Sequence, residues 1–127
     1  MRKLMRKIAI VGAGMSHFGV NYPQLRSVDM WYEAWLEAQK LTDHGIKPHD
    51  IDELFLGNFT ADLFNHQGHL GPLMANAIGL SPKPASRLEG ACASSGIAFR
   101  QAVLSIASGL NDVVCVGGVE QMNELNT

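Results

Sequence analysis

Residues 89–96 read Glu-Gly-Ala-Cys-Ala-Ser-Ser-Gly and join a short extended segment to a long apolar helical pattern. Residues 84–88 before them predict a strand, and the helical pattern starts directly after Cys92. Gly90 and Ala91 are small enough for a sharp turn between strand and helix, so we expect Cys92 in the first turn of that helix. Backbone N–H groups without helical partners face outward there and favour a thiolate. This elbow makes Cys92 a candidate nucleophile.

Both cysteines also have a structural interpretation. Free cysteine is among the most buried residue types, so the alternative for Cys92 is a small apolar core residue. We favour the nucleophile because of the elbow around it. Cys115 lies inside a predicted strand at 113–118 and is interpreted as a core residue.

The composition is that of an ordinary soluble domain. The 127 residues carry a formal net charge of -2, and 46% of them are apolar. No basic stripe supports nucleic-acid binding, and no apolar run approaches the roughly 18 residues of a membrane span. Two cysteines without an extracellular spacing pattern indicate reduced thiols and a cytoplasmic location.

The start of the chain predicts a strand of a parallel sheet. Residues 7–11 form a compact β-branched run bounded by glycine, as expected for a strand buried on both faces. The Gly12-Ala13-Gly14 that follows invites a dinucleotide-binding interpretation. We disfavour it because His17 stands where the motif needs glycine or alanine, and because the next helix starts too late to reach a pyrophosphate.

The remaining pattern alternates helices and strands. Ser27 is expected to cap a helix that ends near residue 43, and Pro72 suits the first turn of a short helix. The other expected elements are strands at 54–59, 84–88 and 113–118 and a helix at 93–108. That last helix is apolar nearly all round, which predicts burial on most sides. The order is β-α-β-α-β-α-β, an α/β fold with a mostly parallel sheet and a buried helix after the elbow.

Two histidines lie in a polar, glycine-containing loop at residues 60–71. His66 and His69 are three residues apart and could share a metal ion, but no cysteine or third ligand lies near at a recognisable spacing. We therefore expect a solvated loop and assign no metal ligand.

Four motifs together resemble the thiolase family. They are Gly12-Ala13-Gly14-Met15 with Phe18-Gly19, Asp50-Ile51-Asp52, Cys92-Ala93-Ser94-Ser95-Gly96, and Gly117-Gly118-Val119-Glu120-Gln121-Met122. A cysteine elbow alone also suits other condensing enzymes of the same superfamily, and the last motif favours thiolases. The match is closest to the archaeal and sterol-carrier-type branch. Residues 1–127 then resemble the N-terminal part of a thiolase-like domain, a half-fold that is incomplete relative to the family.

The resemblance implies acyl transfer between thioesters. In the family, a cysteine at the position of Cys92 attacks an acyl-coenzyme A (acyl-CoA), and CoA or a second acyl-CoA then takes or extends the acyl group. The backbone N–H of Cys92 would help to hold the thioester oxyanion. CoA and acyl-CoA are substrates here, no bound cofactor is implied, and no residue is assigned to CoA binding. Glu89 departs from the asparagine that many biosynthetic thiolases carry three residues before the nucleophile.

The family's catalytic histidine and second cysteine lie in downstream motifs that this sequence does not contain. We therefore expect Cys92 to depend on a missing C-terminal half or on a chain that supplies both residues, within a homodimer or hetero-oligomer. A non-catalytic interaction or scaffold protein with the same half-fold is the alternative. An independent cysteine hydrolase is disfavoured, because no histidine follows the nucleophile.

Overall fold

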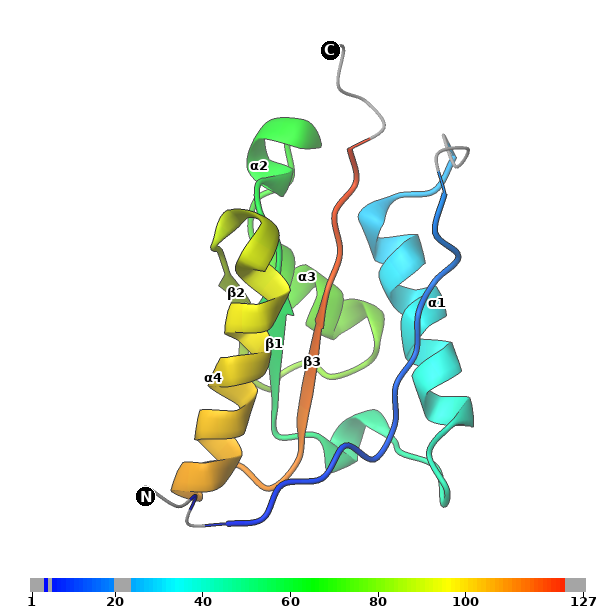
Figure 1. Ribbon diagram of the computed structural model, residues 1–127. Helices are drawn as coiled ribbons and strands as arrows, with labels where there is room; N and C mark the ends of the chain where they lie inside the picture. The colour runs from blue at the N-terminus through cyan, green and yellow to red at the C-terminus, as the bar shows by residue number, and fades with distance from the viewer. Residues whose placement is uncertain (1–3, 5, 20–23, 123–127) are drawn as a thin grey trace.

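The computed structural model describes residue 4 and residues 6–19 and 24–122, which form a mixed α/β fold (Figure 1). In chain order the elements are α1 (Ser27–Lys40), the 3-10 turn η1 (Pro48–Asp50), β1 (Glu53–Gly57), α2 (Ala61–Phe64), α3 (Leu70–Ala77), β2 (Ala85–Leu88), the 3-10 turn η2 (Ala91–Ala93), α4 (Ser94–Ser108) and β3 (Val114–Gly118).

The three strands form one parallel sheet in the order β2-β1-β3. Along β1, Leu54 and Leu56 point to one face and are fully buried, whereas Phe55 points to the other face. This alternation between two apolar faces requires a layer of helices on each side of the sheet. The predicted α/β class with a parallel sheet is confirmed.

Helices α1 and α3 cover the face that Leu54 and Leu56 share, and they build the larger core. Two tryptophans of α1 are buried against it, Trp31 and Trp35, with 5% and 7% of their surface exposed. The indole N–H of Trp31 donates to the carbonyl of Met74 in α3 at 3.1 Å. The polar atom of a buried indole is thus satisfied, and the bond fixes α1 against α3.

Helix α4 covers the opposite face through Ala98 and Ala102, which pack on Phe55. The expected helix after the elbow is present, but its burial is one-sided. Away from that contact, α4 carries three large apolar side chains, Ile97, Phe99 and Leu104, with 39%, 47% and 41% of their surface exposed. The expectation of burial on most sides is therefore wrong for this chain, because among the described residues α4 is fully buried only on the side that packs on the sheet.

The expected first strand at 7–11 is wrong. This segment is extended but pairs with no strand in the described part of the chain, and Ile10 is 74% exposed. It lies instead along α1 (Figure 1). A Cβ added to Gly14 would lie 2.1 Å from the carbonyl oxygen of Ala34, and one added to Gly12 would lie 2.4 Å from the hydroxyl of Thr42. The glycines of this motif permit close packing on a helix, which accounts for them without a nucleotide.

Two local predictions also need correction. Ser27 is the first residue of α1 rather than its cap, and the carboxylate of Asp29 accepts the N–H of the capping Arg26 at 2.9 Å. Ser27 is held by a distant partner, because its N–H donates to Oε1 of Gln121 at 2.9 Å. The predicted loop at 60–71 contains the short helix α2, and α3 begins at Leu70, two residues before Pro72.

Candidate active site

Cys92 lies at the middle of η2, two residues before the first residue of α4, and is exposed. The chain leaves β2 at Leu88 and reverses through Gly90 and Ala91, and Ala91 adopts a positive φ of 50°. The turn is tight enough to require a backbone conformation that residues other than glycine rarely adopt. The structure therefore places Cys92 where the elbow predicted, at the start of the helix that covers the sheet.

A buried serine holds the elbow together. Ser94 is 4% exposed; its Oγ accepts the N–H of Gly90 at 3.0 Å and donates to the carbonyl of Ala91 at 2.7 Å. These two bonds close a small ring through Gly90 and Ala91, the two residues before Cys92. Neither bond follows from a pattern of residue spacing, because both depend on the left-handed turn at Ala91.

The ends of two strands form the floor beneath this helix start. Gly57 and Gly118 are register partners at the ends of β1 and β3. A Cβ on Gly57 would lie 2.5 Å from the Cα and N atoms of Ser95, and one on Gly118 would lie 2.0 Å from the Oγ of Ser95. Only hydrogen fits at both positions, and so α4 can approach the sheet closely within one turn of Cys92.

Glu120 joins the loops that follow those two strands. Its carboxylate accepts the side-chain N–H of Asn58 at 3.1 Å and the backbone N–H groups of Phe59 and Thr60 at 2.7 and 3.3 Å. Asn58 is 2% exposed and also donates to the carbonyl of Val119 at 2.8 Å. The Glu120 motif contributed to the family resemblance, but the sequence reasoning assigned no role to Glu120 or Asn58.

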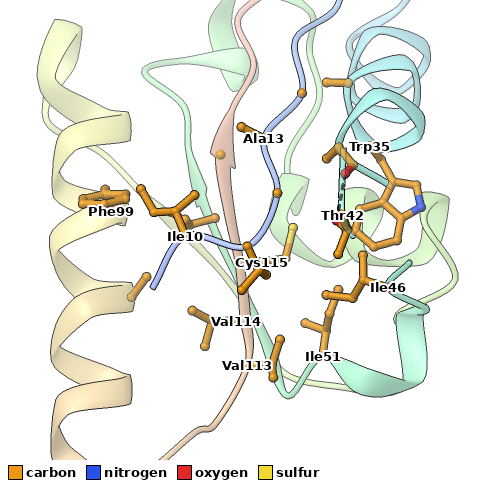
Figure 2. A pocket seen from close by; sticks show the side chains of 18 of the residues that line it. Ile10, Ala13, Trp35, Thr42, Ile46, Ile51, Phe99, Val113, Val114 and Cys115 are labelled. Atoms are coloured by element: carbon orange, nitrogen blue, oxygen red, sulfur yellow. Dashed lines mark hydrogen bonds between the residues drawn. The ribbon is translucent and has the colours of Figure 1, made fainter. Parts of the chain in front are cut away.

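An apolar groove of about 230 Å³ opens elsewhere, between β3, α1, α4 and the extended segment at 8–14. Figure 2 shows Ile10 beside Phe99 of α4 on one side of it, Trp35 and Ile46 on the other, and Cys115 between them. Burial raises the pKa of the Cys115 thiol to about 12. Cys115 is half-buried, packs against the larger core and lines this groove, whereas Cys92 does not line it.

Comparison with known proteins identifies the family of this chain. Residues 8–127 match the family model described as the N-terminal domain of thiolase. The chain belongs to the thiolase family. Among curated relatives, this thiolase chain is 46% identical over 122 residues to the acetyl-CoA acetyltransferase of Methanocaldococcus jannaschii. It is 39% identical over 121 residues to the acetyl-CoA acetyltransferase of Methanothermobacter thermautotrophicus.

Both matches cover 95% of this thiolase chain, but the chain spans only 30% and 31% of the length of the two relatives. A solved acetyl-CoA acetyltransferase from Syntrophomonas wolfei superposes with a TM-score of 0.69 at 20% identity, over 80% of this chain and 26% of that one. The family resemblance expected from the four motifs is confirmed, and the similarity is to the N-terminal part of longer thiolases.

The described histidines of this thiolase chain make no hydrogen bond to Cys92. His44 and His49 form surface contacts with the neighbouring Asp43 and Asp50, at 3.8 and 3.3 Å. His66 and His69 are both exposed and adopt positive φ values of 53° and 56°. None of the described histidines hydrogen-bonds to Cys92, so the described residues do not assemble the hydrolase arrangement that was disfavoured from the sequence.

Metal ligands and membrane spans are both absent from the part of the chain that the structure describes. Within it no three side chains of histidine, cysteine, aspartate or glutamate gather as metal ligands. In residues 4, 6–19 and 24–122 no helix has both the length and the apolarity to cross a membrane.

Proposed function

We propose that this chain is the N-terminal part of a thiolase-type acyltransferase in which Cys92 carries the acyl group. The observation that carries the proposal is the exposed thiol of Cys92 at the start of α4, above the floor formed by Gly57 and Gly118. The names of the two archaeal relatives support acetyl-CoA as the acyl donor. Both cysteines are free thiols, which suits a cytoplasmic location.

The first half-reaction exchanges one thioester for another. The Cys92 thiolate attacks the thioester carbonyl carbon, and the tetrahedral oxyanion is held by the N–H of Cys92. The bond from carbon to the CoA sulfur then breaks, CoA leaves as a thiolate and takes a proton from solvent, and an acyl-Cys92 thioester remains. Thiolate is both nucleophile and leaving group, so the exchange stays close to equilibrium.

The second half-reaction requires groups that these 127 residues do not supply. Transfer of the acyl group to CoA or to a second acyl-CoA needs the family's histidine and second cysteine, whose motifs are absent. We therefore propose that a C-terminal thiolase half, in the same assembly, supplies both. The exposed apolar side chains of α4 support such a partner, since exposed apolar patches mark sites of protein association.

The test separates the two half-reactions. Purified chain is incubated with acetyl-CoA, and intact-mass measurement follows acetylation of the chain while a thiol dye follows CoA release. We expect one acetyl group per chain on Cys92, lost in Cys92→Ala and retained in Cys115→Ala, with no turnover until a separately expressed C-terminal thiolase half is added. Full turnover by the chain alone would contradict the dependence on a second half.

The non-catalytic scaffold interpretation predicts a different result. If Cys92 is not acetylated either alone or with the C-terminal half, the chain is a binding protein that keeps the fold. The absence of any hydrogen bond from Cys92 to a described histidine favours this alternative over the hydrolase.

A further inference from the structure

The backbone N–H groups of the elbow differ in whether they have a hydrogen-bond acceptor. Gly90 donates its N–H to Oγ of Ser94 at 3.0 Å, and Ala91 donates to Oε1 of Glu89 at 2.6 Å. Ala93 donates to the carbonyl of Gly90 at 3.0 Å. Among the described residues, the N–H of Cys92 has no acceptor. Three of the four consecutive donors are thus occupied, and the remaining one belongs to the nucleophile.

Ser94 is central to this arrangement because it follows Cys92 in the chain and bonds back to the two residues that precede it. Its hydroxyl accepts from Gly90, two residues before the nucleophile, and donates to the carbonyl of Ala91, one residue before it. The side chain is 4% exposed, so water does not replace these bonds if they are lost. The ring also stabilises the positive φ of Ala91, which an alanine does not adopt by itself.

We propose that Ser94 is a positioning residue that keeps the N–H of Cys92 unpaired and aimed outward, as the oxyanion donor for acyl transfer. The inference rests on the proposed function, in which a thioester oxygen becomes negatively charged beside Cys92. A serine that only stabilised the helix end would affect every reaction of Cys92 alike. A positioning residue affects acylation more than alkylation, because alkylation needs the thiolate and no oxyanion donor.

The principal experiment measures both reactions in Ser94→Ala. We expect the rate of acetylation by acetyl-CoA to fall by about 10-fold to 100-fold, less than the roughly 100-fold to 1,000-fold cost of removing one oxyanion donor outright, because the N–H of Cys92 is displaced and not deleted. The rate of alkylation by iodoacetamide should change less than about threefold, since the thiolate remains at the helix start. Ser94→Thr keeps the hydroxyl and should recover most of the acetylation rate. Equal loss of both rates in a folded Ser94→Ala variant would overturn the proposal.

A matched control comes from the other end of α4. The hydroxyl of Ser108 donates to the carbonyl of Ser105 at 2.8 Å, three residues back, as Ser94 does to Ala91. Ser108→Ala removes the same kind of bond far from the elbow. It should leave the ratio of acetylation to alkylation unchanged, and a similar change in both variants would overturn the specific role of Ser94.

Amide hydrogen exchange decides the inference without any acyl transfer. In the unmodified chain, NMR should show slow exchange at Gly90 and Ala93 and fast exchange at Cys92. Protection of the Cys92 amide would overturn the proposal even if Ser94→Ala fails to fold. A chain that shows the expected exchange but is never acetylated, with or without the C-terminal half, would refute the proposed function and leave the positioning of the amide established.

Discussion

Ala91 is the residue at which the backbone of the elbow is strained. Its φ of 50° costs an alanine on the order of 1 kcal/mol, and glycine removes this cost but adds a similar entropy loss on folding. We therefore expect Ala91→Gly to change the free energy of unfolding by less than about 0.5 kcal/mol. Ala91→Val should destabilise by about 1–3 kcal/mol, because a β-branched side chain is a genuine outlier at positive φ.

Urea unfolding of the two Ala91 variants tests this interpretation. A valine variant as stable as the unmodified chain would show that the elbow has another conformation in solution. A glycine variant that loses more than about 2 kcal/mol would contradict the strain, since glycine adopts this φ freely.

The buried thiol of Cys115 predicts instability in alkali. Its pKa rises from an ordinary 9.0 to about 12, so the unfolded chain loses this proton at lower pH than the folded chain. The contribution to stability is complete below pH 9.0 and is lost progressively as the pH rises toward 12. Cys115→Ala should flatten the decline in the free energy of unfolding across this window, measured by urea titration. If the free energy of unfolding falls equally with rising pH in both proteins, the Cys115 thiol is not the cause of the decline.

Sequence reasoning located the candidate nucleophile but not the hydrogen-bonded groups of the elbow and of the strand ends. The position of Cys92 was predictable because the strand, the small residues and the apolar helix follow one another in the chain. A turn formed by consecutive residues can be predicted from the sequence around it. Glu120 and Asn58 were not predictable as a pair, since 62 residues separate them and only the folded sheet brings their loops together. Ser94 is two residues from Cys92, yet its hydrogen bonds depend on the φ of Ala91, which no residue pattern reveals.

At the level of elements, the close approach of α4 to the strand ends depends on Gly57. A methyl group there would lie 2.5 Å from backbone atoms of Ser95, which cannot move without displacing the helix. We expect Gly57→Ala to destabilise the chain by about 1–3 kcal/mol, as overpacking does. Gly96 lies in α4, and a methyl group added to it would meet nothing within 4 Å, so Gly96→Ala should stabilise by up to about 1 kcal/mol.

Urea midpoints of the two glycine variants give the comparison directly. Equal midpoints would show that α4 does not contact the sheet as closely as the structure has it. The elbow should respond as well, because Gly57→Ala shifts the helix start and should slow the alkylation of Cys92, whereas Gly96→Ala should not.

The starts of β1 and β3 are joined through Asp52, which makes the sheet sensitive to acid. Its carboxylate accepts the N–H groups of Val113 and Asp112 at 3.0 and 2.9 Å. These bonds, with a smaller contribution from Lys83, hold the pKa of Asp52 below its ordinary 3.8. The stabilisation is present above pH 3.8 and is lost as the pH falls through the lower, folded-state pKa.

Replacement of Asp52 by asparagine tests whether this carboxylate causes the loss of stability at low pH. The side chain of Asp52 is 37% exposed, so solvent screening should keep the loss at neutral pH below about 1 kcal/mol. The free energy of unfolding of Asp52→Asn should depend less on pH below 3.8 than that of the unmodified chain. If the free energy of unfolding of the variant falls with pH as steeply as that of the unmodified chain, Asp52 does not cause the sensitivity to acid.

The elements themselves were largely predictable, with one informative exception. Strands β1, β2 and β3 and helices α1, α3 and α4 all overlap their predicted ranges, because apolar runs and flanking glycines or prolines mark them locally. The run at 7–11 has the same composition as a buried strand, but a strand also requires a hydrogen-bonding neighbour. The glycines that follow it pack on α1 instead, and no strand pairs with it among the described residues.

For the molecule as a whole, the outer surface of α4 predicts association. Leu104 is 41% exposed on that helix, two turns after the exposed Ile97 on the same side, and such a surface in water favours a second chain or a C-terminal half. Sedimentation velocity should therefore show larger species as the concentration rises. Leu104→Glu should weaken this association by on the order of tenfold, as loss of one central apolar contact does.

Leu36 on α1 provides the matched control, because it is 39% exposed on a different helix. If the surface of α4 is the contact, Leu36→Glu should leave the sedimentation profile unchanged while Leu104→Glu shifts it toward the monomer. Equal effects would show that general hydrophobicity drives the association, and a single monomeric species at every concentration would contradict it. A C-terminal thiolase half that restores turnover should bind the Leu36→Glu chain normally and the Leu104→Glu chain weakly, because the proposed partner covers α4.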